Sequence, residues 1–372
     1  MAYLSKVTLC SAGMLLQRCA RRLREVVPKA PRSYSRAFHC SLPSRSASTD
    51  PKAIADAFLS KFSRGQAFTR SQLLDANQLR LFSLALNRAH LWPSSQRSLE
   101  DAEPVEGTPI PAGYHLAYFT PPQLPTILGQ DGTDASFNPD PPFTRRMWAG
   151  GGIEWPSSSS KSGSTHFLRI GDVVSETTKV LSCEPKTIKK TGESMLVVGV
   201  LKEFRDSKGN LCVVDRRNWV FRGALDPANP APVPQKPALL SKSEMAALEK
   251  EKAVRFFNQD VATLFRFSAL TFNAHRIHYD KPWATNVEGH RNVVVHGPMN
   301  LIAMLDMWRD EQDSGDEGLY PSSIEYRATS PVYAGEGYRI MMDVSAVDLG
   351  KAELSAVSDD GTLCMKSTII SW

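Results

Sequence analysis

Histidines are concentrated in one stretch of the chain, from Arg266 to Trp308. It contains four of the eight histidines in the protein: His275, His278, His290 and His296. Imidazole titrates near neutral pH and can therefore accept and release a proton during a reaction. The first two lie in a short polar turn, where several hydrogen-bonding side chains come close together in sequence. This stretch is therefore a candidate site for proton transfer.

The same stretch predicts a helix that begins at Pro298. Gly297 allows an unusual backbone just before it, and proline suits the first helical position because its missing N–H is not needed there. Apolar residues then recur at the spacing of one helical face, at Leu301, Met304, Leu305 and Trp308. We expect this helix in a core. Its N-terminal amides and positive dipole end suit a developing negative oxygen, and since proline has no N–H, the Gly297 amide is the candidate donor.

The turn resembles the motif of the MaoC-like dehydratase/hydratase family of the hotdog fold. That motif is an Asp, an Asn-Pro pair two residues on, and then an apolar residue and a His. The matching segment is Asn273-Ala274-His275-Arg276-Ile277-His278. In this resemblance His278 falls on the catalytic His, and Asn273 stands where the family has its catalytic Asp.

A second segment narrows the resemblance to one branch of the family. Mitochondrial 3-hydroxyacyl-thioester dehydratases and mesaconyl-CoA hydratases have a segment like Arg146-Met147-Trp148-Ala149-Gly150-Gly151 in a first hotdog. They have an Asn-x-His-x-Ile-His-Tyr-Asp run, matched here at Asn273 to Asp280, in a second. The resemblance covers roughly Ala53 to Trp372. It implies an α+β fold, a double hotdog in which two antiparallel β-sheets each wrap around a long central helix.

The resemblance also implies roles for individual residues. His278 would carry the proton, and Asn273, whose amide does not titrate, would orient water or the substrate hydroxyl. Gly297 would hold the enolate-like oxygen. The remaining expected substrate-binding residues are Tyr279, Arg146 and Trp148, and Arg145 and Arg146 could meet a pantetheine or nucleotide phosphate.

Each of these residues also has a purely structural interpretation. His278 could be a buried histidine with satisfied hydrogen bonds beside Tyr279. Asp280 is more typical of a helix cap than of a catalytic carboxylate, and we expect His296 to hydrogen-bond backbone where the helix begins. His275 and His296 could join His278 around a metal. No carboxylate cluster or helical His spacing accompanies them, so we expect neither a metal nor another cofactor.

The first residues predict a mitochondrial targeting segment. Residues 1–49 contain nine Lys or Arg and a single acid, Glu25, so their net charge is +8. Because the whole chain has a net charge of +5, the remaining residues carry −3. Such a basic, Ser-rich and acid-poor start is typical of a transit peptide. Arg36, Phe38 and Ser41 match a two-step processing signal, which places the mature start near Ser46 in the matrix. A disordered basic tail that binds a partner is the alternative. The acidic remainder gives no reason to expect nucleic acid as a partner.

Composition along the chain predicts two domains. Asp226 to Pro237 has five prolines in twelve residues and is the clearest linker. We therefore expect a transit peptide at 1–45, a degenerate hotdog at 52–225, a linker at 226–240 and a catalytic hotdog at 241–372. A faint repeat supports an old duplication, since Leu79 to His90 is similar to Leu264 to His275.

Secondary structure follows from the local patterns. Residues 51–92 are helix-prone, with a helical approach to the second domain at 241–260. A strand-like run occurs at His115 to Phe119. Strands are predicted at 173–182, 195–205 and 211–221, and again at 322–330, 338–347, 352–358 and 363–371, with a hairpin turn at Asp359-Asp360-Gly361.

The resemblance implies a reversible (3R)-hydroxyacyl-thioester dehydratase, and the predicted targeting segment implies that it acts in mitochondrial type II fatty acid synthesis. Its substrate would be a thioester of acyl carrier protein or coenzyme A. The two halves would form an intramolecular pseudo-dimer, and a homodimer is left open. One rival is a hydratase of a branched dicarboxylic CoA ester such as mesaconyl-CoA. Another is an inactive hotdog module that only binds acyl chains. No apolar run is long enough to span a membrane.

Overall fold

The computed structural model describes residues 50–62, 66–156, 166–189, 191–226, 228–312, 319–343 and 350–371. These residues all belong to one compact unit, Ala47–Trp372. The expected transit peptide lies outside them. Within the described residues, none of the helices is long and apolar enough to cross a membrane.

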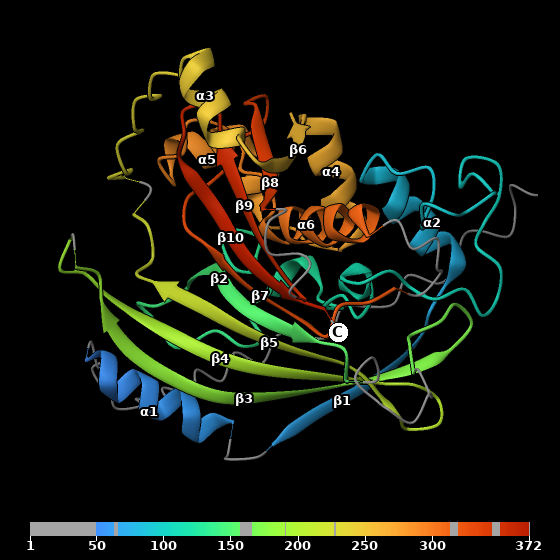
Figure 1. The fold of residues 1–372 in the computed structure, drawn as a ribbon. Coiled ribbons are helices and arrows are strands. Elements are labelled where there is room, and N and C mark those ends of the chain that lie inside the picture. The colour runs from blue at the N-terminus through green and yellow to red at the C-terminus, as the bar shows by residue number, and fades with distance from the viewer. Residues whose placement is uncertain are drawn as a thin grey trace, which may run out of the picture. The chain divides into compact units, whose positions relative to one another are not determined.

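One antiparallel sheet of ten strands, with helices packed on it, forms the unit. Its order is β1-β3-β4-β5-β2-β7-β10-β9-β8-β6. In Figure 1 the first five strands cross the lower part of the picture and the last five rise beside α6. The strands are β1 (Ala67–Leu73), β2 (Arg145–Glu154), β3 (Val173–Thr187), β4 (Ser194–Arg205), β5 (Leu211–Arg222), β6 (Lys252–Phe257), β7 (Ser323–Ala328), β8 (Tyr338–Asp343), β9 (Lys351–Ser358) and β10 (Leu363–Ile370).

The two halves of the sheet have the same topology. From the outer edge inward, β1-β3-β4-β5-β2 in the first half corresponds to β6-β8-β9-β10-β7 in the second. The halves meet where β2 pairs with β7, from Gly150 opposite Arg327 to Glu154 opposite Ser323. The two sheets expected from the sequence are therefore joined edge to edge into one.

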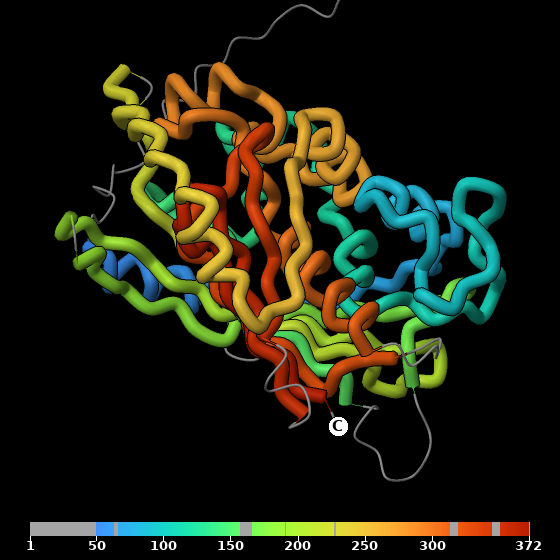
Figure 2. The backbone as a smooth tube through the Cα atoms, turned by 45° about the horizontal axis from the view of Figure 1, so that its top comes forward, coloured from blue at the N-terminus to red at the C-terminus, as the bar shows by residue number. Residues whose placement is uncertain are grey.

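The faint sequence repeat corresponds to equivalent elements. β1 and α2 in the first half recur as β6 and α4 in the second at one constant offset along the chain. Asp75 caps α2 and Asp260 caps α4, each accepting a hydrogen bond from the backbone three residues on. The two helices pack against each other through Phe82 and Phe267, whose ring centroids are 5.4 Å apart; Figure 2 shows these segments side by side.

The helices differ between the halves. The described helical elements are α1 (Pro51–Lys61), α2 (Ala76–Ala85), η1 (Tyr114–Ala117), η2 (Pro125–Ile127), α3 (Lys242–Glu249), α4 (Val261–Leu270), η4 (Arg276–His278), α5 (Lys281–Asn286) and α6 (Gly297–Glu311). Among the described residues, a long central helix, α6, occurs in the second half and has no counterpart in the first. In the first half, two 3-10 turns stand in its place, because the proline-dense segment before β2 cannot continue a helix.

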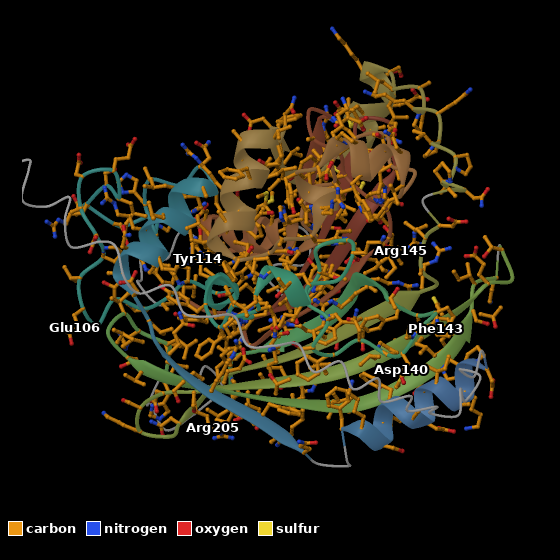
Figure 3. All side chains as sticks on the ribbon, turned by 180° about the vertical axis from the view of Figure 1, so that it is seen from behind. Glu106, Tyr114, Asp140, Phe143, Arg145 and Arg205 are labelled. Carbon is orange, nitrogen blue, oxygen red and sulfur yellow. The ribbon has the colours of Figure 1, made fainter. Side chains whose placement is uncertain are left out.

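Helix α6 is buried on all sides, as its apolar sequence predicts. Leu301, Ile302 and Leu305 are fully buried. A side chain at Gly113, beside η1, would lie 2.8 Å from Leu305, so the first half covers the face of α6 that its own sheet leaves open. Tyr114, the first residue of η1 (labelled in Figure 3), is fully buried, and its hydroxyl donates to Asp306 of α6 at 3.1 Å.

Three local predictions were wrong. The strand-like run at 115–119 forms η1 instead, since Tyr114 and His115 are both buried in a 3-10 turn. The strands β1 and β6 were missed, because each lies at an edge of the sheet and shows little apolar alternation. The remaining predicted strands match β3, β4, β5, β7, β9 and β10, and the described part of β8.

Candidate active site

The polar turn after α4 is held by its own hydrogen bonds. Phe272 adopts a positive φ of 48°, and the Asn273 N–H donates to the Ser268 carbonyl at 2.8 Å. The Asn273 carboxamide oxygen accepts the backbone N–H of His275 at 3.1 Å. Asp280 caps α5 through the Trp283 N–H. The expectation that Asp280 is a cap is therefore confirmed, and the turn is a fixed support for the histidines within it.

One hydrogen bond fixes the tautomer of His278. Its Nδ1 lies 2.7 Å from the carbonyl oxygen of Val294, which can only accept, so Nδ1 carries the proton. Nε2 then has a free lone pair, and no described residue occupies it with a hydrogen bond. Burial, together with the neighbouring His275, lowers the pKa of His278 to about 3. The imidazole is therefore neutral and able to accept a proton at Nε2.

His296 lies against the His278 ring. The two ring centroids are 3.6 Å apart and the rings are nearly parallel. His296 Nε2 pairs with the Ser268 hydroxyl at 2.8 Å. It was expected to bond the backbone where the helix begins, but its ring is turned to α4 instead. Burial, followed by the neighbouring His278 and His275, keeps the pKa of His296 well below 6.5, so it supports the His278 ring as a neutral neighbour.

The start of α6 lies against a side chain from the other half. A Cβ at Gly297 would overlap the indole of Trp148 on β2, so only glycine fits there. Trp148 in turn stacks on Tyr326 of β7, with ring centroids 4.6 Å apart. Within the described residues, no acceptor binds the Gly297 N–H. Two residues expected from distant sequence segments, Trp148 and Gly297, are therefore in contact.

Both halves line a cavity of about 1080 Å³ at this point. Its lining includes the expected catalytic and substrate-binding residues His278, Asn273, Gly297, Tyr279, Arg146 and Trp148, but not Arg145. Its apolar lining is well suited to an acyl chain and includes Leu116, Phe204, Trp219, Phe267, Ile277 and Val295.

Tyr279 and the two arginines are placed less centrally. The Tyr279 side chain is partly exposed, and its hydroxyl donates to the Ala274 carbonyl at 2.9 Å. Arg146 lies over the Trp219 ring and 3.9 Å from Asp134. Arg145, at the start of β2 (Figure 3), does not line the cavity. The structure thus gives Arg145 no direct part in the site.

The contact between His275 and Glu288 at the site was not predicted from the sequence. His275 Nε2 lies 3.7 Å from the carboxylate of Glu288 and 3.8 Å from that of Asp131. Glu288 is buried in the cavity wall and accepts the Trp283 indole N–H at 2.8 Å. Burial raises its pKa and His275 lowers it, and the net shift is downward. The loop before Gly289 brings Glu288 to the turn, and no motif spacing signals that. The described residues contain no group of three or more side chains suited to a metal.

The buried histidines make stability depend on pH. We expect the free energy of unfolding to fall as pH decreases from about 7 to about 5. Burial lowers the pKa values of His278, His290 and His296 in the folded protein, whereas the unfolded chain titrates near 6.5. Below that pH the unfolded chain takes up protons that the folded protein excludes, at up to about 1.4 kcal/mol per pH unit for each histidine. Urea denaturation at pH 7, 6 and 5 measures this, and equal stability at pH 5 and 7 would contradict it.

Known proteins are similar to this chain in sequence. The model of the hydroxyacyl-thioester dehydratase type 2 family matches residues 113–334. Mesaconyl-C(4)-CoA hydratase of Chloroflexus aurantiacus is 28% identical over 72% of this chain and 85% of its own length. The mitochondrial hydroxyacyl-thioester dehydratase type 2 of Schizosaccharomyces pombe is 28% identical over 63% of this chain and 77% of its own.

Solved structures show the same fold. A MaoC-like dehydratase from Phytophthora capsici aligns with a TM-score of 0.53 at 14% identity, over 82% of this chain and 95% of its own. A Mycobacterium tuberculosis protein described as a double hotdog aligns with a TM-score of 0.50 at 15% identity, over 84% and 98%. The expected double hotdog is thereby confirmed. The chain belongs to the hydroxyacyl-thioester dehydratase type 2 family of MaoC-like enzymes and is a hydro-lyase.

Proposed function

We propose that this enzyme interconverts (3R)-hydroxyacyl and trans-2-enoyl thioesters in the mitochondrial matrix, as a step of type II fatty acid synthesis. The acyl group would be carried by acyl carrier protein or coenzyme A. One observation carries the proposal: the free Nε2 of His278 and the unbonded N–H of Gly297 line the same largely apolar cavity. A proton acceptor and an oxyanion donor are the two groups that this reaction needs.

In the dehydration direction, His278 Nε2 takes the proton from C2 of the substrate. The electrons of the C2–H bond pass toward the thioester, and its oxygen gains negative charge beside the Gly297 N–H and the positive end of α6. The imidazolium is then stabilised by that negative charge, which offsets the effect of burial on its pKa. His278 gives the proton to the leaving hydroxyl, the C3–O bond breaks, the C2–C3 double bond forms, and water departs.

Asn273 would position the hydroxyl at C3. Its carboxamide oxygen is already engaged by the His275 N–H, so the NH₂ group remains to donate to a substrate oxygen. An amide cannot take a proton as the family's Asp does. His278 is therefore the main proton carrier, and Glu288, which lies 3.7 Å from His275, supplies negative charge that acts on His278.

We further assign the two halves different tasks. The half at 52–225 would line the acyl chamber, the half at 241–372 would carry the reacting groups, and 226–240 would link them. Between Gly223 and Ser241 the described residues form no helix or strand, in agreement with a linker. The basic leader and the mitochondrial location in the name of the fission yeast relative support the matrix assignment.

The first test is hydration of crotonyl-CoA by protein that begins at Ser46. We expect the enoyl absorbance to fall, because His278 and Gly297 can activate water and hold the enolate in the reverse direction. The product should be (3R)-3-hydroxybutyryl-CoA, identified with enzymes specific for one enantiomer. If the protein binds acyl thioesters of coenzyme A and of acyl carrier protein but hydrates neither, the proposed enzymatic activity is wrong and an inactive binding module is favoured.

The change Asn273→Asp tests how the site departs from the family. We expect the variant to keep or increase hydration, because Asp restores the family residue and its oxygen can still accept the His275 N–H. Asn273→Ala should lower kcat/KM by about 5- to 30-fold, as one or two hydrogen bonds of about 1 kcal/mol each are lost. Steady-state kinetics measures the activity of both variants. An Asn273→Ala variant as active as the wild type would show that Asn273 has no role in the reaction.

A further inference from the structure

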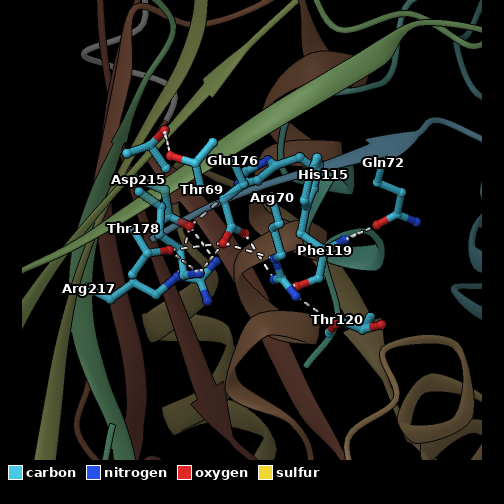
Figure 4. Close-up of polar contacts among 12 residues, drawn as sticks. Thr69, Arg70, Gln72, His115, Phe119, Thr120, Glu176, Thr178, Asp215 and Arg217 are labelled. Atoms are coloured by element: carbon cyan, nitrogen blue, oxygen red, sulfur yellow. Dashed lines mark hydrogen bonds and ion pairs between the residues drawn. The ribbon is translucent and has the colours of Figure 1, made fainter. Parts of the chain in front are cut away.

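Charged side chains occupy inward positions on strands that are otherwise apolar. Along β4, Leu196, Val198 and Val200 face one side and pack with α1 in a buried cluster. The next residue on that side is Lys202, which lines the cavity and is 92% shielded from solvent. Glu176 on β3 and Asp215 on β5 are buried at neighbouring positions. With Arg70 and Arg217, these residues form a charged cluster in the first half of the protein. Figure 4 shows Arg70, Glu176, Asp215 and Arg217 of this cluster.

Glu176 is shared by two cations. Its carboxylate accepts hydrogen bonds from Lys202 Nζ at 3.0 Å and from Arg70 at 3.2 and 3.3 Å. Arg70 also donates to two carbonyl groups of the chain, so its donors are well used. Lys202 has one further partner, the Thr178 hydroxyl at 3.1 Å. An ammonium group has three N–H donors, and one of those of Lys202 remains without a partner among the described residues.

Asp215 is paired with a single cation. One of its oxygens accepts Arg217 Nε at 2.8 Å and Nη2 at 2.5 Å. His115 Nε2 lies 3.6 Å from the same oxygen, too far for a hydrogen bond. Within the described chain, Arg217 Nη1 donates to no acceptor, and Arg217 lines the cavity. The cluster therefore presents two unused donors, one on Lys202 and one on Arg217, to the cavity.

The charges of the cluster do not balance. Arg70, Lys202 and Arg217 are three cations, and Glu176 and Asp215 are two carboxylates. The other acids in the cavity wall do not supply the missing negative charge, since Asp134 lies by Arg146 and Glu288 by His275. Arg70 is 35% exposed and therefore partly solvated, whereas Lys202 and Arg217 are 10% and 21% exposed. A donor on a charged group that is shielded from water costs free energy unless a partner pairs with it. A bound anion would supply that partner.

The cluster lies close to the reacting groups. Trp148 contacts Gly297 on one side and stacks on Tyr326 on the other. Burial and then the charge of Asp215 raise the pKa of Tyr326, and Arg217 lowers it, so this hydroxyl lies within the field of the cluster. Lys202 and Arg217 of the cluster thus line the same cavity as Gly297, whose amide is proposed to hold the thioester oxygen.

Burial also indicates which anion would fit. The phosphate of a carrier is attached to a nucleotide or to a folded protein, so it must stay near the surface. Glu176, Lys202 and Asp215 are each more than nine-tenths buried. A group that reaches them must belong to the acyl chain itself. A carboxylate is the anionic group that an acyl chain carries, and it can accept from both a lysine and an arginine.

We propose that Lys202 and Arg217 bind a carboxylate on the acyl chain, so that the preferred substrates are thioesters of dicarboxylic acids. This rests on the proposed function, since the same cavity must accept the thioester for hydration. It keeps the hydration chemistry of the proposed function and assigns the acyl substrates to dicarboxylic thioesters, as in the rival hydratase inferred from the sequence, in place of the plain chains of fatty acid synthesis.

A matched pair of substrates tests the subsite. trans-Glutaconyl-CoA and trans-2-pentenoyl-CoA have acyl chains of the same length. The first ends in a carboxylate and the second in a methyl group. We expect kcat/KM for hydration to be at least about tenfold higher for the first, as for a hydrogen bond between charged groups. Lys202→Met should remove most of that ratio, whereas Lys202→Arg should keep it. The control Lys179→Met, at a partly exposed ion pair with Glu203, should leave the ratio unchanged.

Binding of saturated analogues separates this inference from the function. Calorimetry with glutaryl-CoA and valeryl-CoA requires no turnover, and glutaryl-CoA should bind at least about tenfold more tightly to the wild type. Equal binding, a preference for the methyl chain, or a ratio that survives in a folded Lys202→Met variant would overturn the subsite. Tight glutaryl-CoA binding without hydration of either enoyl thioester would support the subsite and contradict the proposed function.

Discussion

The indole of Trp148 occupies the space in which residue 297 would otherwise hold a side chain. Because Trp148 belongs to the first half and Gly297 begins the central helix of the second, this contact places the proposed oxyanion donor by means of both halves. The stacked Tyr326 continues the contact onto β7, the strand that joins the two sheets. The surroundings of that amide therefore include residues of both halves.

Charge is divided unevenly between the halves at the cavity. In the second half, burial keeps His278 and His296 neutral, and the Val294 carbonyl fixes the proton of His278 on Nδ1. In the first half, a cluster of formal charges faces the same space. The neutral side suits proton transfer, because an uncharged imidazole can accept a proton at once. The charged side suits recognition, because fixed ions in a low-dielectric site discriminate strongly between charged and neutral groups.

The sequence predicts much of this arrangement where the signal is local. The turn around His278, the helix from Pro298 and most strands of the two meanders follow from spacing and turn residues, and Gly297 follows from its place before a proline. The edge strands β1 and β6 were missed since a strand paired on one side shows little apolar alternation. Glu288 could not be found, because its contact with His275 depends on tertiary folding. Lys202 is an intermediate case: its position in the apolar alternation of β4 marks it as inward-facing once the strand is recognised.

The most direct measurement of the central claim compares the wild type with His278→Ala in the hydration of a trans-2-enoyl thioester. The account predicts that His278→Ala lowers kcat by a factor of about 10² to 10⁴, the usual contribution of a general acid–base group. Circular dichroism should show that the variant is still folded. His90→Ala, at a histidine outside the cavity, should retain full activity. A folded His278→Ala protein that hydrates enoyl thioesters at the wild-type rate would contradict the assignment of proton transfer to this residue.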